Sequence, residues 1–358
     1  MRRILFFIFI LVFLSPVFLS SIEIEQGKVK LTLHDSYGRF SLSYIDSNKD
    51  IPLLFARDPR TTVLSILVDN SVYRMGESAG FKQNISRTTD GAKITWTGSN
   101  FNVIEEFTLV SPFNGNTKSG VKISISVENK TQKKLDIGLR YLFDTYLSER
   151  QNNHFYLGDK QNGIKDETEL TSYQYSYWIS PDPGNSNSVG FLGMLKGSGT
   201  TRPDRVVFAN WQRLNESSWS FSPKDNRSFS IPPYSNNDSA VAYFYTPTEI
   251  FKGDMRKITL YIGNFDKDGY KSANDTDRDK TQGVASLYEE TASATDNGYE
   301  NGSQSNTSSA SKELDRVERA ISEIDSLIYS SSTVTEDELS MARKLVNELE
   351  SRKKNFSD

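Results

Sequence analysis

The chain has 358 residues, enough for one large domain or two ordinary ones, and its formal net charge of −4 comes without a basic stripe, which argues against nucleic acid as a partner. It contains no cysteine and only two histidines, His34 and His154. These counts exclude a disulfide framework, a thiol nucleophile and a cysteine-ligated zinc site, and they leave little room for histidine general-base chemistry.

Residues 1–21 have the pattern of a secretory signal peptide. Arg2 and Arg3 form a short basic region, an apolar run follows over residues 4–14, and small residues stand at Ser20 and Ser21. The run is short for a membrane span, which needs about 20 apolar residues, although an uncleaved N-terminal anchor stays open as the alternative. Because a secreted eukaryotic chain of this size without cysteine would be unusual, we expect an exported bacterial protein of the periplasm or cell surface, with no membrane span after cleavage.

Residues 22–265 alternate between short apolar segments and polar turns. Aromatic residues make up 12% of the chain, and the clearest segments are 28–34, 39–45, 62–68, 103–110, 121–127, 135–143, 189–194, 206–211, 240–245 and 257–262. Alternation of this kind is typical of half-buried strands, and Asp69-Asn70 has the composition of a hairpin turn. About a dozen strands without a convincing helix between them predict a mainly β protein, a large antiparallel β-sandwich.

The segment 135–150 reads LDIGLRYLFDTYLSER and contains the first candidate site residues, Arg140 and Asp144. Both lie on the same face of the predicted strand, opposite its aromatic residues. On one interpretation they face a ligand on a concave face of the sandwich, and Trp211 stacks on a sugar ring. On the other, Asp144 ends the strand by bonding to backbone groups, and Trp211 fills the core.

Glycosidase chemistry would require a second acid at a fixed separation from Asp144. Glu149 and Asp159 are candidates only because they are close in sequence, and His154 is the one nearby histidine. The sequence therefore selects no catalytic residue.

A loop at the end of the predicted sandwich resembles a calcium-binding loop. Its oxygen-bearing residues are Asn264, Asp266, Asp268 and, six residues after Gly269, Asp275. The first position is Asn rather than Asp, the last is Asp rather than Glu, and a strand rather than a helix precedes the loop. The alternative is an acidic turn that leaves the last strand. No other cofactor is expected.

The composition changes after residue 265. Residues 266–311 are rich in Asp, Asn, Ser, Thr and Gly, which is typical of a flexible linker. In residues 312–356 apolar side chains recur every three or four positions, and Thr335 with Glu338 forms a capping box, so we expect a C-terminal helical hairpin. The hairpin either closes on itself or serves for docking or self-association.

An ordered series of motifs in residues 23–263 resembles a family of exported bacterial β-sandwich modules of envelope and cell-surface proteins. The motifs are Gly38-Arg-Phe40, Gly138-Leu-Arg140 with Asp144-Thr145, Asp204-Arg-Val-Val-Phe-Ala209 with Trp211, and Asp238-Ser-Ala-Val-Ala242. The resemblance implies a large sandwich, by analogy the supersandwich of mutarotase-like proteins, and no established enzymatic activity. After Thr145 this chain lacks the Asn-Asp pair of the family pattern.

These observations favour a non-enzymatic exported envelope protein that binds or scaffolds through its sandwich, with an envelope protein or a glycan as partner. The first alternative is a carbohydrate-active or carbohydrate-binding protein of mutarotase-like fold. The second is a periplasmic scaffold or motility accessory that self-associates through residues 312–356.

Overall fold

The computed structural model describes residues 21–271, except residues 48, 150, 159–162, 185–188, 198 and 233–236. The chain divides into two units, Met1–Ser272 and Ala273–Asp358, and all of the described residues belong to the first. Residues 1–20 of the predicted signal peptide, most of the predicted linker, the predicted helical hairpin and Asp275 lie outside the described residues. Among the described helices, none is long and apolar enough to cross a membrane.

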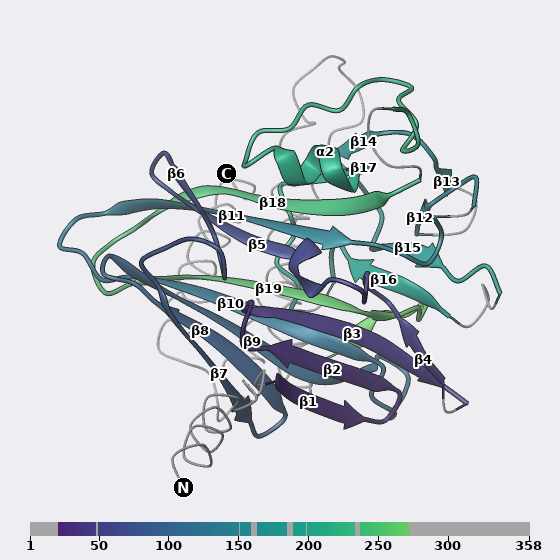
Figure 1. The fold of residues 1–358 in the computed structure, drawn as a ribbon, viewed down its shortest axis with the longest axis horizontal. Coiled ribbons are helices and arrows are strands. Elements are labelled where there is room, and N and C mark those ends of the chain that lie inside the picture. Colours follow the sequence, from purple (N-terminus) through teal and green to yellow (C-terminus); the bar gives the residue numbers. More distant parts are fainter. Residues whose placement is uncertain are drawn as a thin grey trace, which may run out of the picture. The chain divides into compact units, whose positions relative to one another are not determined.

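The protein is mainly β, with three antiparallel sheets (Figure 1). The four-stranded sheet has the order β1 (Ser21–Gln26), β2 (Val29–His34), β3 (Arg39–Asp46) and β4 (Lys49–Pro52). The six-stranded sheet has the order β14 (Thr168–Leu170), β17 (Arg205–Asn210), β18 (Ser239–Ile250), β11 (Leu135–Asp144), β5 (Val63–Val68) and β6 (Ser71–Arg74).

The third sheet has ten strands. Its order is β13 (Gly163–Ile164), β12 (Phe155–Leu157), β15 (Tyr177–Pro181), β16 (Gly190–Met194), β19 (Met255–Asn264), β10 (Gly120–Asn129), β9 (Phe101–Pro112), β8 (Gly91–Thr97) and β7 (Lys82–Thr88), while β20 (Tyr270–Lys271) pairs with β9. A 3-10 turn, η1 (Pro59–Thr61), precedes β5, and a six-residue helix, α2 (Trp211–Glu216), follows β17.

The sandwich core lies between the six-stranded and ten-stranded sheets. The ring of Phe143 on β11 lies 6.4 Å from that of Phe191 on β16, and Trp178 Nε1 on β15 donates a 2.6 Å hydrogen bond to the hydroxyl of Tyr243 on β18. In Figure 1, β18 and β11 lie above β19 and β10. The four-stranded sheet adds to the same core, because the ring of Phe40 on β3 packs 4.9 Å from Phe107 on β9.

The predicted antiparallel sandwich is confirmed, and its strands follow from the alternation in the sequence. In β10 the β-branched residues Val121, Ile123, Ile125 and Val127 are all buried, while the residues between them are partly exposed. Asp69 has a φ of 53° in the two-residue turn between β5 and β6, a conformation that Asp tolerates in hairpin turns.

Two expectations for the sandwich were wrong in detail. β11 is not half-buried, because every residue in it except Asp136 is buried. The reason is α2, which the alternation pattern did not predict and which, with the residues that follow it, packs on the outer face of the six-stranded sheet. Six residues are too few to establish a helical period in the sequence.

Candidate functional site

Four strand ends of the six-stranded sheet meet at one edge. β17 runs antiparallel to β18, β18 to β11 and β11 to β5, so the ends of β17 and β11 lie beside the starts of β18 and β5. The register pairs Asp144 with Ala240 and Asn210 with Ser239. Asp238, immediately before β18, therefore comes close to Asp144 although 94 positions separate them.

Three acids gather at this edge, and we call Asp144, Glu149 and Asp238 the carboxylate cluster. One carboxylate oxygen from each lies within 4.8 Å of the other two. Asp144 is buried, whereas Glu149 and Asp238 are partly exposed. The cluster thus combines one desolvated acid with two that solvent reaches.

Burial raises the pKa of the Asp144 carboxyl well above its ordinary value, because the charged form loses its hydration. The neighbouring charges of Asp238 and Glu149 raise this pKa further, and a hydrogen bond with Thr61 opposes the rise. Asp144 is therefore held in its protonated form to a higher pH than a solvated aspartic acid.

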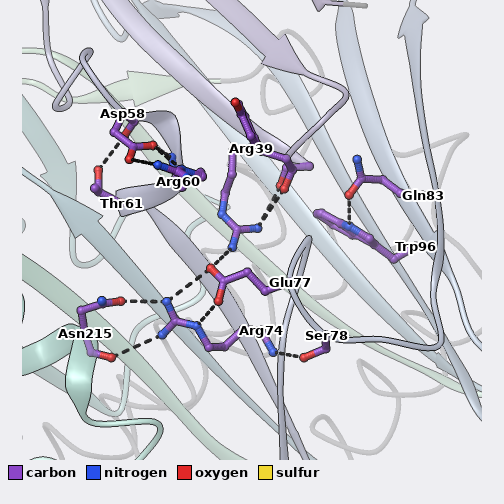
Figure 2. Close-up of polar contacts among 12 residues, drawn as sticks. Arg39, Asp58, Arg60, Thr61, Arg74, Glu77, Ser78, Gln83, Trp96 and Asn215 are labelled. Carbon is purple, nitrogen blue, oxygen red and sulfur yellow. Dashed lines mark hydrogen bonds and ion pairs between the residues drawn. The ribbon is translucent and has the colours of Figure 1, made fainter. Parts of the chain in front are cut away.

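The segment before β5 supports the cluster from one side. Asp58 caps η1, and its carboxylate receives two hydrogen bonds of 2.8 and 2.7 Å from the Nε and Nη2 of Arg60 (Figure 2). The hydroxyl of Thr61 donates to the carbonyl oxygen of Asp58 at 2.8 Å. The Thr61 carbonyl in turn accepts a hydrogen bond of 2.9 Å from Trp211 Nε1.

Three aromatic rings belong to the same edge. Trp211 is half-buried, and its backbone N–H donates to the carbonyl oxygen of Asp238 at 3.3 Å. The backbone N–H of Phe55 donates to the carbonyl oxygen of Asp144 at 3.1 Å, and its ring lies 6.3 Å from that of Tyr146. Tyr146 is 41% exposed, so an amphipathic ring is available to solvent two residues from Asp144.

Arg140 lies on the same strand but has different partners. Its Nη2 donates to the carbonyl oxygen of Leu214 at 2.7 Å, and its Nη1 donates to those of Ser217 and Ser218. Burial lowers its pKa to about 10, and the charges of Arg74 and Arg205 act in the same direction. These contacts hold the C-terminal end of α2 and the residues after it, where carbonyl groups lack helical partners.

Two further arginines flank Arg140 across the sheet. Arg74 donates to the side-chain oxygen of Asn215 at 2.7 Å, and Arg205 donates to the carbonyl oxygen of Phe221 (Figure 2 shows the first contact). The guanidinium groups of Arg140 and Arg205 lie 5.3 and 4.7 Å from the ring centre of Phe244. Of the three residues predicted for ligand binding, Asp144 and Trp211 therefore lie close together, because both form hydrogen bonds with Thr61. Arg140 instead binds the carbonyl groups of Leu214, Ser217 and Ser218.

The described residues of the predicted calcium loop have protein partners. The side-chain oxygen of Asn264 accepts from the backbone N–H of Gly190 at 3.1 Å, and that of Asp266 accepts from the backbone N–H of Asp268 at 3.0 Å. Asp268 accepts from the side-chain amide of Asn114 at 2.8 Å. Asp275 lies outside the described residues, and calcium binding by this loop stays a prediction.

Two acids of interest were not singled out in the sequence. Asp238 appeared only as the first residue of the Asp238–Ala242 motif and not as a candidate site residue, because only the pairing of β11 with β18 places it beside Asp144. The sequence did contain a signal for Glu105, since this acid occupies an apolar position of the alternating segment 103–110.

His154, the one histidine near Asp144 in sequence, is buried against the ring of Phe229 at 4.8 Å, and burial lowers its pKa to about 4.

No family model and no curated protein sequence matches the chain. Solved structures similar in fold include a galactose mutarotase related enzyme from Lactobacillus acidophilus (10% identity, TM-score 0.42, covering 71% of this chain and all of that one) and a galactose mutarotase-like protein from Lactobacillus casei (10%, 0.42, 69% and 100%). An aldose epimerase homologue from C. elegans is similar at 11% identity and a TM-score of 0.43, with 69% of this chain and 98% of that one covered. At sequence identities of 10–11%, these similarities concern the fold alone.

Proposed function

We propose that the protein binds a carbohydrate at the carboxylate cluster. Carboxylate oxygens accept hydrogen bonds from sugar hydroxyls, and the face of an aromatic ring packs against the apolar face of a sugar. The observation that supports the proposal is the convergence of Asp144, Glu149 and Asp238 at one sheet edge beside the exposed ring of Tyr146. The half-buried Trp211 is fixed next to the same acids by its bond to Thr61.

Carbohydrate binding is compatible with the export that we expect for this protein. A glycan of the cell envelope or its surroundings is the partner that suits an exported protein, and the predicted C-terminal helical hairpin would then dock or self-associate separately. Export rests on the predicted signal peptide and docking on residues 312–356; of these, only Ser21 lies in the described part of the chain.

A second candidate is acid–base chemistry on the bound sugar, and the raised pKa of Asp144 favours it. A buried carboxyl that keeps its proton beside partly exposed acids is the arrangement in which one group donates a proton and another accepts one. In this candidate Asp144 is the acid, and Glu149 or Asp238 is the base.

The test begins with a glycan array probed with the purified full chain, followed by calorimetric titration of each oligosaccharide retained. Asp238→Asn and Glu149→Gln remove a charge with little change in shape, and we expect each to weaken binding at least tenfold, as loss of a charged hydrogen bond does (about 1.5–3 kcal/mol). Asp136→Asn is the matched control, because Asp136 is an exposed acid on β11, outside the cluster.

Equal affinity of the two cluster variants and the wild type would rule out this site, and an array without any bound glycan would rule out the function. Chromatography of the retained oligosaccharides after incubation separates the two candidates. Conversion by the wild type that Asp144→Asn abolishes supports the enzyme, and recovery of unchanged oligosaccharide supports binding alone.

A further inference from the structure

A carboxylic acid stands in the middle of the apolar face of the ten-stranded sheet. Glu105 is 2% exposed and alternates along β9 with the buried residues Val103 and Phe107. Its partners in the adjacent strands are Ile94 on β8 and Ile125 on β10, both fully buried. An acid in this position is costly unless it is neutral or has polar partners.

Glu105 has two such partners, each from a different sheet. The hydroxyl of Tyr141 on β11 donates a hydrogen bond to its carboxyl oxygen, and Arg39 on β3 contributes a nearby positive charge. Burial raises the pKa of Glu105 to about 7, while Tyr141 and Arg39 oppose the rise. Among the described residues, these two are the charged or titratable groups that act on Glu105.

Arg39 divides its contacts between the core and the surface. Its side chain is 4% exposed, Nη2 donates to Glu77 Oε1 at 2.8 Å, and Nη1 donates to the carbonyl oxygen of Gly38 at 3.1 Å. Its Nε is buried and has no hydrogen-bond partner within the part of the chain that the structure describes. Arg39 therefore keeps one unused donor in the interior, where a charged carboxylate would attract it.

Glu77 and Arg74 connect Arg39 to helix α2 (Figure 2). Neighbouring contacts in this series share an atom, so strengthening one weakens the other. Glu77 Oε2 already accepts from Arg74 Nε at 2.7 Å. Glu77 Oε1 accepts from Arg39 at 2.8 Å and, more weakly, from Arg74 Nη2 at 3.4 Å. The same Nη2 of Arg74 donates to the side-chain oxygen of Asn215 at 2.7 Å. If Arg39 releases Glu77, Glu77 Oε1 becomes available to Arg74, and the bond from Arg74 to Asn215 weakens.

We propose that the proton on Glu105 controls this series of contacts. With the proton in place, Arg39 binds Glu77 and Arg74 binds α2. When Glu105 is ionised, its charge draws the Arg39 guanidinium inward, the freed Oε1 of Glu77 binds Arg74 Nη2 more closely, and the contact of Arg74 with Asn215 on α2 weakens. Helix α2 begins at Trp211, which lies at the sheet edge that carries the carboxylate cluster. A change of pH that ionises Glu105 would therefore alter how firmly the segment at this edge is held.

The test follows the Arg74 Nε–H and the side-chain amide of Asn215 by ¹H–¹⁵N NMR between pH 5 and 9, with no ligand present. In the wild-type full chain we expect both signals to shift with a midpoint near the pKa of Glu105, about 7. Glu105→Gln still accepts the hydrogen bond from Tyr141 and cannot ionise, so its signals should stay constant. Glu106→Gln is the matched control, because Glu106 is the next residue on β9 and is exposed.

Signals that titrate equally in Glu105→Gln, or that do not titrate in the wild type, would overturn the proposal. Tyr141→Phe provides a second variant that keeps Glu105. Removing the hydroxyl removes a contact that lowers the pKa of Glu105, so the midpoint should move to higher pH. An unchanged midpoint would contradict the role of this acid. No sugar is needed, so the outcome is independent of the proposed carbohydrate site.

Discussion

The Nη2 of Arg140 donates a hydrogen bond of 2.7 Å to the carbonyl oxygen of Leu214, 74 residues further along the chain. Leu214 belongs to the last turn of α2, where carbonyl groups have no partner within the helix. A buried guanidinium with fixed donors supplies that partner and favours the negative end of the helix dipole. Arg140 thereby attaches the segment that begins with Trp211 to the centre of the six-stranded sheet.

Replacing Arg140 with Met should destabilise the protein. The variant keeps an apolar stem but leaves the carbonyl groups of Leu214, Ser217 and Ser218 without their charged donor, which costs roughly 2–4 kcal/mol of unfolding free energy. Urea unfolding measures the loss. Arg87→Met is the control, because the exposed Arg87 makes one hydrogen bond to the Glu23 carbonyl and should change stability by less than about 0.5 kcal/mol. Equal losses in the two variants would contradict the role of Arg140.

Gly138→Ala tests the glycine of the Gly138-Leu-Arg140 motif, which packs against Trp219. A Cβ at this position would lie 2.9 Å from two ring carbons of Trp219 and 3.2 Å from Pro247. The ring must move, and overpacking of this kind costs about 1–3 kcal/mol. Thermal unfolding should show the loss, with a shift in tryptophan emission because Trp219 is displaced. Gly184→Ala should leave the melting temperature unchanged, since the nearest atoms there lie 3.9 Å away.

The strands could be predicted from the sequence because their signal is local. Alternation along segments such as 121–127 and the turn at Asp69-Asn70 act over a few residues, and the structure contains them. The partners of Arg140 and Asp144 could not be predicted in this way. They depend on the pairing of β11 with β18 and on a short helix, which bring together residues 74 and 94 positions apart.

Glu167→Gln should destabilise the protein far more than a nearby change of the same kind. The Glu167 side chain is fully buried and accepts hydrogen bonds of 2.6 and 3.0 Å from Arg213 on α2 and one of 2.9 Å from the backbone N–H of Lys224. Removing its charge replaces charged hydrogen bonds to the partly exposed Arg213 with weaker neutral ones, at a cost of about 1.5–3 kcal/mol.

Glu169→Gln is the matched control for Glu167→Gln. Glu169 lies two residues further along the chain and pairs with Arg205 at a partly exposed position, where an ion pair contributes about 0–1 kcal/mol. Guanidinium chloride unfolding of both variants measures the difference. A loss in Glu167→Gln no larger than that in Glu169→Gln would show that the buried pair does not hold α2.

The raised pKa of Asp144 makes a prediction about stability and pH. A carboxyl whose pKa in the folded protein exceeds its ordinary 3.8 stabilises the fold fully below that value and loses this contribution as the pH rises through the folded-state pKa. Asp144→Asn cannot ionise, so the stability of the variant relative to the wild type should increase from pH 5 to pH 8. Urea unfolding at both pH values measures the change. Asp136→Asn, at an exposed position on the same strand, is the matched control for the removal of one carboxylate charge. A parallel response of Asp144→Asn and the wild type would mean that Asp144 is ionised over this whole pH range, against the effect of its burial.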